Sequence, residues 1–298
     1  MKPLEVVILG SGSIIPTRER HHSSIWVRRE GDTFLWDCGE GTQRQIQKAG
    51  LSFMKIDKIF ITHWHADHYA GLLGLIETLN LEGRERRLDI YGPDASRFVQ
   101  LLSDMSWYDF GFEVKAVDVE YEDEEEAILL EEDEYIIKSV PADHSVPAVA
   151  YCLEEKDSMN INEKKAAKYD LHPGPKMGEI KKKGKIKHKG QDIRLEDISD
   201  KNKGRKLVYS GDTLPTETIK NLSREADLLI HDSTFLDESS HKHASAKDSA
   251  KLANQANVKK LLLTHYSRRY KDTDPLLKIA RQHHDNVEIA KDLMKIVL

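Results

Sequence analysis

The residues with the clearest chemical potential form one short run, Thr62-His63-Trp64-His65-Ala66-Asp67-His68. Imidazole nitrogens and a carboxylate oxygen are ligands that suit divalent zinc. The run lies where an apolar, strand-like segment (58–62) ends and a segment with helical spacing (67–81) begins. Because side chains alternate along an extended chain, His63 and His65 should point to the same side. The run therefore predicts a metal site, and histidines that merely cap a helix are the alternative.

One turn of chain cannot supply all the ligands of two ions, so further ligands must come from other loops. Three candidates each follow a strand-like segment: His144, Asp212 and His265. Each of them, taken alone, is also typical of an ordinary polar loop. Their shared position after strands favours a common role in binding metal.

The elements that must position these residues alternate along the chain. Apolar or β-branched segments predict strands at 6–9, 25–27, 33–36, 58–62, 88–91, 135–140, 149–153, 206–209, 228–230 and 260–263. Apolar residues at helical spacing and helix-favouring composition predict helices at 42–48, 67–81, 95–102, 246–255 and 275–283. This alternation indicates an α/β fold.

Composition sets limits on the function. The 298 residues suit one large core, and 45 Lys+Arg against 51 Asp+Glu give a net charge of −6, so any polyanionic partner must meet a local basic patch. The two cysteines, Cys38 and Cys152, are too few for a disulfide framework. The apolar segment 6–9 is shorter than a signal-peptide core, and no segment approaches the ~20 apolar residues of a membrane span. We expect a cytoplasmic protein.

Two charged segments stand apart from this pattern. Residues 120–134 are strongly acidic and are interpreted as solvated strand edges and turns. Residues 154–192 are polar, contain Pro173-Gly174-Pro175 and end in six lysines, which predicts an insertion into the core fold. The lysines are Lys181, Lys182, Lys183, Lys185, Lys187 and Lys189. From the residues alone, a solvated loop and a phosphate-binding surface both remain open.

The H-x-H-x-D-H run, followed by spaced His, Asp and His, resembles the metallo-β-lactamase superfamily. This resemblance implies an αββα sandwich with metals at one end of its sheets. Further segments are similar to the ribonuclease Z family: Leu9-Gly10-Ser11-Gly12 with Pro16-Thr17, the segment Asp37 to Gln45, Ser210-Gly211-Asp212-Thr213, and the segment His265 to Tyr270. Two positions depart from the family pattern. His231-Asp232-Ser233-Thr234 replaces His-Glu-Ala-Thr, and His243-Ala244-Ser245 replaces His-Ser-Thr.

The resemblance implies a role for each candidate residue. His63, His65 and His144 would hold one Zn²⁺, while Asp67, His68 and His265 would hold a second, with Asp212 between them. Zinc lowers the pKa of bound water to about 7, so water would be the nucleophile at neutral pH. Asp67 would hold that water, and His243 with Asp232 would protonate the leaving oxygen. A solvated histidine at a helix start is the alternative for His243.

The family implies precursor tRNA as the substrate, a 3′-hydroxyl on the tRNA and a 5′-phosphate on the trailer. We expect one domain (1–298) with an inserted arm (154–192) that binds the substrate, in a homodimer. The implied substrate-binding residues are Gly174, Pro175, Lys181, Lys182, Lys183 and Arg269, although a structural role for Arg269 is equally compatible. The alternatives are a phosphodiesterase of the same fold that acts on small molecules and a non-catalytic RNA-binding relative.

Overall fold

The computed structural model describes residues 3–107 and 109–298. The chain divides into two compact units. The first comprises the residues up to 130, residues 137–153 and residues 206–298, and the second comprises 131–136 and 154–205. The second unit therefore includes the predicted insertion and continues beyond residue 192 to Arg205.

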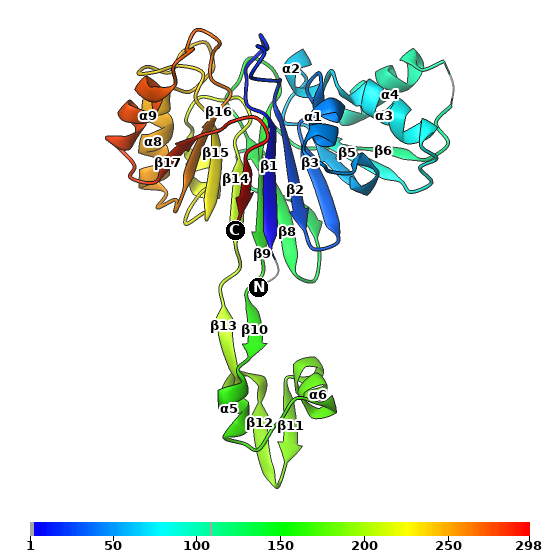
Figure 1. Cartoon of the computed structure of the whole chain (residues 1–298), viewed down its shortest axis with the longest axis vertical. Helices are drawn as coiled ribbons and strands as arrows, with labels where there is room; N and C mark the ends of the chain where they lie inside the picture. Colours follow the sequence, from blue (N-terminus) through cyan, green and yellow to red (C-terminus); the bar gives the residue numbers. More distant parts are fainter. Residues whose placement is uncertain (1–2, 108) are drawn as a thin grey trace. The chain divides into compact units, whose positions relative to one another are not determined.

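Two seven-stranded sheets form the framework of the first unit within the described part of the chain (Figure 1). The first sheet has the order β18-β1-β2-β3-β4-β5-β6, with β1 (Leu4–Gly10), β2 (Ser24–Arg29), β3 (Asp32–Trp36), β4 (Lys58–Phe60), β5 (Leu88–Gly92), β6 (Val114–Asp118) and β18 (Lys295–Val297). The second has the order β17-β16-β15-β14-β9-β8-β7, with β7 (Ala127–Glu131), β8 (Tyr135–Pro141), β9 (Val149–Glu155), β14 (Lys206–Tyr209), β15 (Leu228–Asp232), β16 (Leu261–Thr264) and β17 (Val287–Ile289). Strands β3 to β6 and β14 to β17 are parallel.

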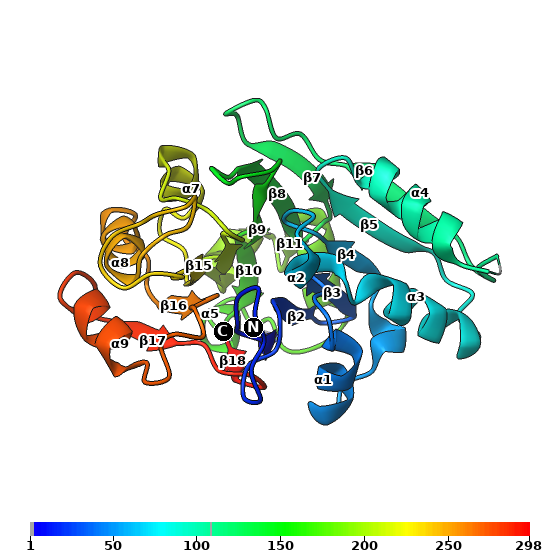
Figure 2. The same ribbon diagram turned by 90° about the horizontal axis from the view of Figure 1, so that it is seen from above.

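Helices cover the outer face of each sheet, as Figure 2 shows from above. The first sheet packs against α1 (Thr42–Lys48), η1 (Phe53–Lys55), α2 (Ala66–Tyr69), α3 (Leu72–Leu81) and α4 (Ala95–Met105). The second packs against α7 (Glu217–Leu222), α8 (Ala246–Gln255) and α9 (Asp274–Arg281). An apolar layer lies between each sheet and its helices, and burial of apolar surface in such layers favours folding. The predicted αββα sandwich is confirmed.

One predicted helix, 67–81, is wrong as a continuous element, because α2 and α3 are separate. The break falls at Gly71, whose N–H donates to the Cys38 carbonyl at 2.8 Å. A Cβ at Gly71 would lie 2.3 Å from the Gly39 carbonyl oxygen, so only glycine allows the two backbones to approach this closely. The turn after the histidine run is therefore pinned to the segment that follows β3.

Aromatic side chains fill the space between the two sheets near the ends of β3, β4 and β14. Trp36 stacks on Tyr209 with ring centroids 6.1 Å apart, and Phe60 meets Tyr151 edge to face at 5.3 Å. The Tyr151 hydroxyl donates to the Ile61 carbonyl at 2.7 Å. A side chain of the second sheet thus fixes the loop of the first sheet that carries the histidines.

The second unit has a fold of its own, where the sequence indicated only a polar insertion. It contains β10 (Ser158–Ile161), α5 (Glu163–Ala167), α6 (Pro175–Lys183), β11 (Lys185–His188), β12 (Gln191–Arg194), η2 (Leu195–Ile198) and β13 (Ser199–Asn202). The small core consists of Ala166, Leu171, Ile180, Ile186, Ile193 and Ile198.

Among the described residues, no helix has the length and apolar character needed to cross a bilayer.

Candidate metal centre

The first cluster of potential ligands consists of three histidines from two loops. His63 and His65 lie in the loop between β4 and α2, and His144 follows β8. The Nδ1 atom of His65 lies 3.1 Å from His63 Nε2 and 3.1 Å from His144 Nε2. In a tetrahedral shell with metal–nitrogen distances of about 2.0–2.1 Å, two ligand nitrogens lie about 3.3 Å apart. The three imidazoles are therefore spaced as ligands of one ion.

The second cluster joins two carboxylates and two histidines, all buried. His265 Nε2 lies 3.2 Å from Asp67 Oδ2 and 3.2 Å from Asp212 Oδ2. His68 Nε2 lies 3.3 Å from Asp212 Oδ2 and 3.6 Å from Asp67 Oδ2. These atoms come from the start of α2 and from the loops that follow the parallel strands β14 and β16. The carboxyl ends of parallel strands meet at one edge of a sheet, which brings Asp212 and His265 together.

Asp212 connects the two clusters. Its Oδ2 atom also lies 3.8 Å from His63 Nε2 of the first cluster. The Asp212 Oδ1 and His68 Nε2 atoms are buried without a hydrogen-bond partner. Buried polar atoms are normally paired, and these two orphaned atoms are of the kinds that coordinate divalent metals. The donor set thus fits a metal ion, and the clusters form a metal-binding site.

Burial and neighbouring charges act differently on the ligands of the two clusters. Burial lowers the pKa of His63 well below its ordinary value and also lowers the pKa of His65 and His144, so these imidazoles are neutral and each keeps one nitrogen lone pair for a metal. Burial lowers the pKa of His68 and His265, but Asp212 and the other nearby carboxylates outweigh it and raise both pKa values, that of His68 well above the ordinary value. Burial disfavours the charged form of Asp212, but His265 and His68 outweigh it and hold its pKa well below the usual range. Against the same effect of burial, His68 lowers the pKa of Asp67 to about 2.

Asp37 supports this centre, and the sequence analysis assigned it no role. Its carboxylate accepts hydrogen bonds from His68 Nδ1 and from the Tyr209 hydroxyl, both at 2.7 Å. It also accepts from the backbone N–H of Thr62 at 2.8 Å. Because a carboxylate only accepts, His68 Nδ1 must carry a proton, which leaves the Nε2 lone pair for a metal. The sequence signal that could have indicated this role is the place of Asp37 directly after the predicted strand 33–36, within the segment that is similar to the family.

His243 and Asp232 form a pair beside the second cluster. His243 Nδ1 donates to Asp232 Oδ2 at 2.8 Å, while Asp232 Oδ1 accepts from the Thr234 hydroxyl at 2.8 Å. Burial lowers the pKa of His243, but the hydrogen bond and the charge of Asp232 outweigh it and raise the pKa to about 9. The imidazole is therefore protonated at neutral pH. The shorter arm of aspartate still reaches the histidine in this chain.

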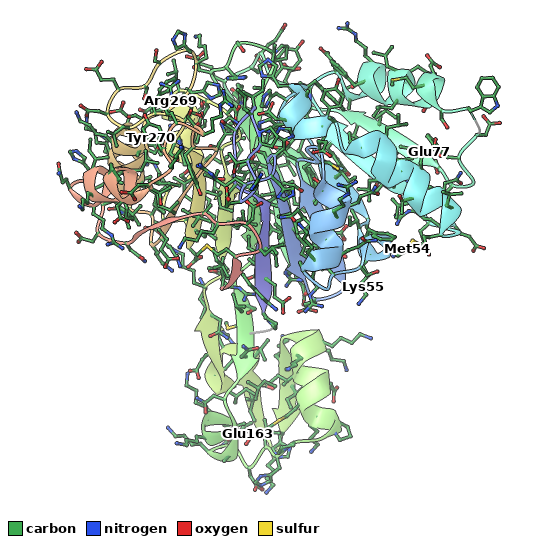
Figure 3. All side chains as sticks on the ribbon, turned by 45° about the horizontal axis from the view of Figure 1, so that its top comes forward. Met54, Lys55, Glu77, Glu163, Arg269 and Tyr270 are labelled. Atoms are coloured by element: carbon green, nitrogen blue, oxygen red, sulfur yellow. The ribbon has the colours of Figure 1, made fainter. Side chains whose placement is uncertain are left out.

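An open pocket of about 700 Å³ exposes this centre. Its lining includes His65, Asp67, His144, Asp212, His243 and His265, together with Arg268, Arg269 and Lys271. Arg269 and Tyr270 lie on the loop that follows β16 (Figure 3). The structure thus brings together every predicted metal ligand, the His243–Asp232 pair and Arg269.

The other predicted substrate-binding residues lie in the second unit. Gly174 precedes α6, Pro175 is its first residue, and Lys181, Lys182 and Lys183 form its last turn. Proline at the first helical position, a glycine after the last one and basic residues at the carboxyl end all favour a helix here. The lysines are exposed.

Comparisons with known proteins identify relatives along the whole chain. A beta-lactamase superfamily domain matches residues 194–266, and a family described as anti-Pycsar protein Apyc1 matches residues 4–102. Ribonuclease Z of Methanothermobacter thermautotrophicus is 40% identical over 98% of this chain and 96% of its own. Ribonuclease Z of Thermococcus gammatolerans is 43% identical over 90% and 85%. The crystal structure of human tRNase Z, short form, has a TM-score of 0.69 and 26% identity, with 98% of both chains covered.

Proposed function

The chain belongs to the ribonuclease Z family of hydrolytic endoribonucleases, and on this premise we propose that it uses two zinc ions to remove the 3′ trailer from precursor tRNA. The products would be tRNA with a 3′-hydroxyl and a trailer with a 5′-phosphate. The observation that carries this proposal is the convergence of seven ligand side chains in two adjoining clusters at the floor of one open pocket.

The donor set supports zinc at both clusters. His63, His65 and His144 would hold one ion, and Asp67, His68 and His265 would hold the other, with Asp212 shared between them. When bound, zinc supplies an activated water at neutral pH and positive charge beside the attacked phosphate. Imidazole nitrogens together with carboxylate oxygens favour zinc over magnesium or calcium, which prefer oxygen ligands alone.

Asp67 has a second role in this proposal, which is to orient the attacking water. Its pKa of about 2 keeps the carboxylate ionised throughout the neutral range. The same low pKa makes Asp67 a weak base, so holding the water contributes more than accepting its proton. Water, and not the 2′-hydroxyl of the RNA, is then the nucleophile.

His243 is the proposed general acid. It lines the pocket, and its Nδ1 atom is occupied by Asp232, so Nε2 can donate a proton to the leaving oxygen. The raised pKa ensures that this proton is present at neutral pH, although the acid is weaker than one with the ordinary pKa near 6.5. Asp232 thus orients the imidazole and maintains its charge.

Two basic surfaces support binding of a polyanion by a chain of net charge −6. At the pocket, Arg268, Arg269 and Lys271 can contact phosphates next to the cleaved bond. In the second unit, the exposed lysines of α6 and β11 can bind the phosphates of the tRNA body. We further propose that the protein works in the cytoplasm as a homodimer, and analytical ultracentrifugation tests the dimer.

The test is cleavage of an end-labelled precursor tRNA by zinc-loaded protein. We expect one cut at the 3′ end of the acceptor stem. Asp67→Ala should lower kcat/KM by more than about 100-fold, which exceeds the loss typical of removing a residue that only hydrogen-bonds to a metal ligand. Asp227→Ala is the matched control, because Asp227 lies immediately before β15, at the amino ends of the strands whose carboxyl ends carry the site.

The failures of this test have distinct meanings. Turnover of a small phosphodiester by zinc-loaded protein that leaves precursor tRNA intact would replace the proposal with a small-molecule phosphodiesterase. Binding of the RNA without hydrolysis of either substrate would indicate a non-catalytic RNA-binding protein.

A further inference from the structure

Two isoleucines face solvent at the edge of the metal pocket. Ile14 and Ile15 lie in the loop between β1 and β2, where 62% of Ile14 and 43% of Ile15 are exposed. Both line the pocket together with the metal-binding residues. Leaving a large aliphatic side chain in water forgoes the stabilisation that its burial would bring. Adjacent exposed isoleucines at a functional pocket therefore indicate a contact with a ligand.

The loop that carries the isoleucines is held firmly from behind. The Asp292 carboxylate accepts hydrogen bonds from the N–H and hydroxyl of Ser11 at 2.9 and 2.8 Å. It also accepts from the N–H and Nδ1 of His21 at 2.8 and 2.9 Å. The N–H of Gly12 donates to the His21 carbonyl at 2.9 Å, which closes the base of the loop. The base of the loop that carries the two isoleucines is thus fixed by contacts within the protein.

The same loop is fastened to the basic segment of the pocket. His265 N–H donates to the Ser11 carbonyl at 3.0 Å, and Arg20 donates to the Tyr270 carbonyl at 3.2 Å while its guanidinium lies over the Tyr266 ring. The two isoleucines and the basic residues Arg268, Arg269 and Lys271 therefore line one continuous side of the pocket. A ligand that matches this side carries phosphates and an adjoining flat apolar surface.

We propose that Ile14 and Ile15 form an apolar shelf for a nucleobase that flanks the cleaved phosphate. The inference rests on the proposed function and deepens it, because it assigns the specificity of the pocket to nucleotides over simple phosphodiesters. Unpaired bases next to a cleavage point can turn an apolar face to a protein, and single-stranded RNA is generally recognised in this way. The base is either the last one of the tRNA or the first one of the trailer.

The experiment compares three substrates: the intact precursor and two precursors with an abasic nucleotide, one on each side of the cleaved phosphate. The enzymes are the wild type, the double variant Ile14→Ser/Ile15→Ser and the conservative double variant Ile14→Leu/Ile15→Leu. Ile128→Ser is the matched control, since Ile128 is 58% exposed on β7 and does not line this pocket. Zinc content and melting temperature are measured for every variant.

For the serine variant on the intact precursor, kcat/KM should fall about 10-fold or more, as expected when two aliphatic side chains lose apolar contacts. The leucine variant should recover most of this loss, and Ile128→Ser should match the wild type. On one of the abasic substrates, the wild type and the serine variant should become equal, because the contact is already absent. That substrate identifies which base is held.

Three results would overturn the inference. One is an unchanged kcat/KM for the serine variant, and another is an equal fall on all three substrates. The third is an equal fall for Ile128→Ser. If the wild type leaves the intact precursor uncut, the proposed function fails as well, whereas a cutting wild type with an unaffected serine variant refutes only the shelf.

Discussion

Asp37→Asn tests whether the protein selects the tautomer of a metal ligand. Asp37 accepts a hydrogen bond from His68 Nδ1 and so leaves His68 Nε2 free to bind a metal. Asparagine has nearly the same shape, but one carboxylate oxygen becomes an amide donor. With the amide nitrogen toward His68, the tautomer with a proton on Nε2 becomes the favoured one, and that proton blocks coordination.

The expected loss of zinc affinity follows from the hydrogen bonds of Asp37 that change. The Asp37 oxygen that accepts from His68 also accepts from the buried Tyr209 hydroxyl. A hydrogen bond to a charged group contributes roughly 1.5–3 kcal/mol, so converting both contacts sets an upper limit of about 3–6 kcal/mol. Loss of an outer partner of a ligand usually lowers metal affinity about 10–100-fold, which is about 1.4–2.7 kcal/mol. We expect the loss of zinc-binding free energy to lie in this lower range, because part of the lost hydrogen-bond energy lowers the free energy of unfolding and not the zinc affinity.

The assay measures zinc occupancy at equilibrium in buffers of defined free zinc. We expect the variant to change the zinc affinity of the two clusters by different amounts. The proposed ion at Asp67, His68 and His265 should bind about 10–100-fold more weakly. The proposed ion at His63, His65 and His144 should bind nearly as before. Asp227→Asn is the control, because Asp227 also accepts a backbone N–H, from Lys206 at 2.7 Å, at the opposite ends of the strands. Equal weakening of both ions, or unchanged occupancy, would refute the reasoning.

Three further predictions concern the same centre. Gly211→Ala should lower the free energy of unfolding by about 2–4 kcal/mol, because Gly211 has φ +59° and a Cβ there would lie 2.7 Å from Thr62 Cβ. Gly50 also has a positive φ, +68°, but no atom lies within 4 Å of its Cβ position, so Gly50→Ala should lower the free energy of unfolding less. Thermal unfolding measures both variants. Asp232→Asn should lower the pKa of His243 from about 9 and move the alkaline limit of kcat to lower pH, and an unmoved pH–rate profile would contradict this role. Zinc occupancy should fall as the pH drops, and it should fall first at the cluster of His68 and His265, whose pKa values nearby carboxylates raise against the effect of burial, and last at that of His63, whose pKa burial lowers; a chelator titration at several pH values measures this.

The side chains that meet in the two clusters could be predicted from sequence as candidate metal ligands because their chemistry is local. Three histidines and an aspartate within six residues are hard to explain without a metal, and Asp212 and His265 follow recognisable strands. His63 and His65 do lie side by side, but not for the predicted reason. Strand β4 ends at Phe60, so His63 and His65 lie in a loop, and their convergence comes from tertiary contacts, not from the alternation of an extended strand.

The supporting residues could not be predicted, because their partners are remote in sequence. Asp37 meets Tyr209 across the space between the two sheets, and Asp292 meets Ser11 from the other end of the chain. In the second unit, Ile180, Ile186 and Ile193 are too widely spaced among lysines to suggest a core, yet all three are buried together. Local patterns identify reactive groups, whereas the contacts that orient them depend on the whole fold.

The exposed lysines of α6 offer a test of how an acidic protein holds RNA. Lys183 lies 2.7 Å from Glu179, whereas no described residue forms an ion pair with Lys181 or Lys182. A lysine that contacts a phosphate releases counterions, so its loss lowers the slope of log affinity against log salt concentration by about 0.7–0.9. Lys181→Ser/Lys182→Ser should therefore lower the slope for precursor tRNA by up to about twice that value. Lys183→Ser, the matched control on the same turn, should have less effect because Glu179 already offsets its charge. Equal slopes for all variants, measured by fluorescence anisotropy with metal-free protein, would remove α6 from the tRNA-binding surface.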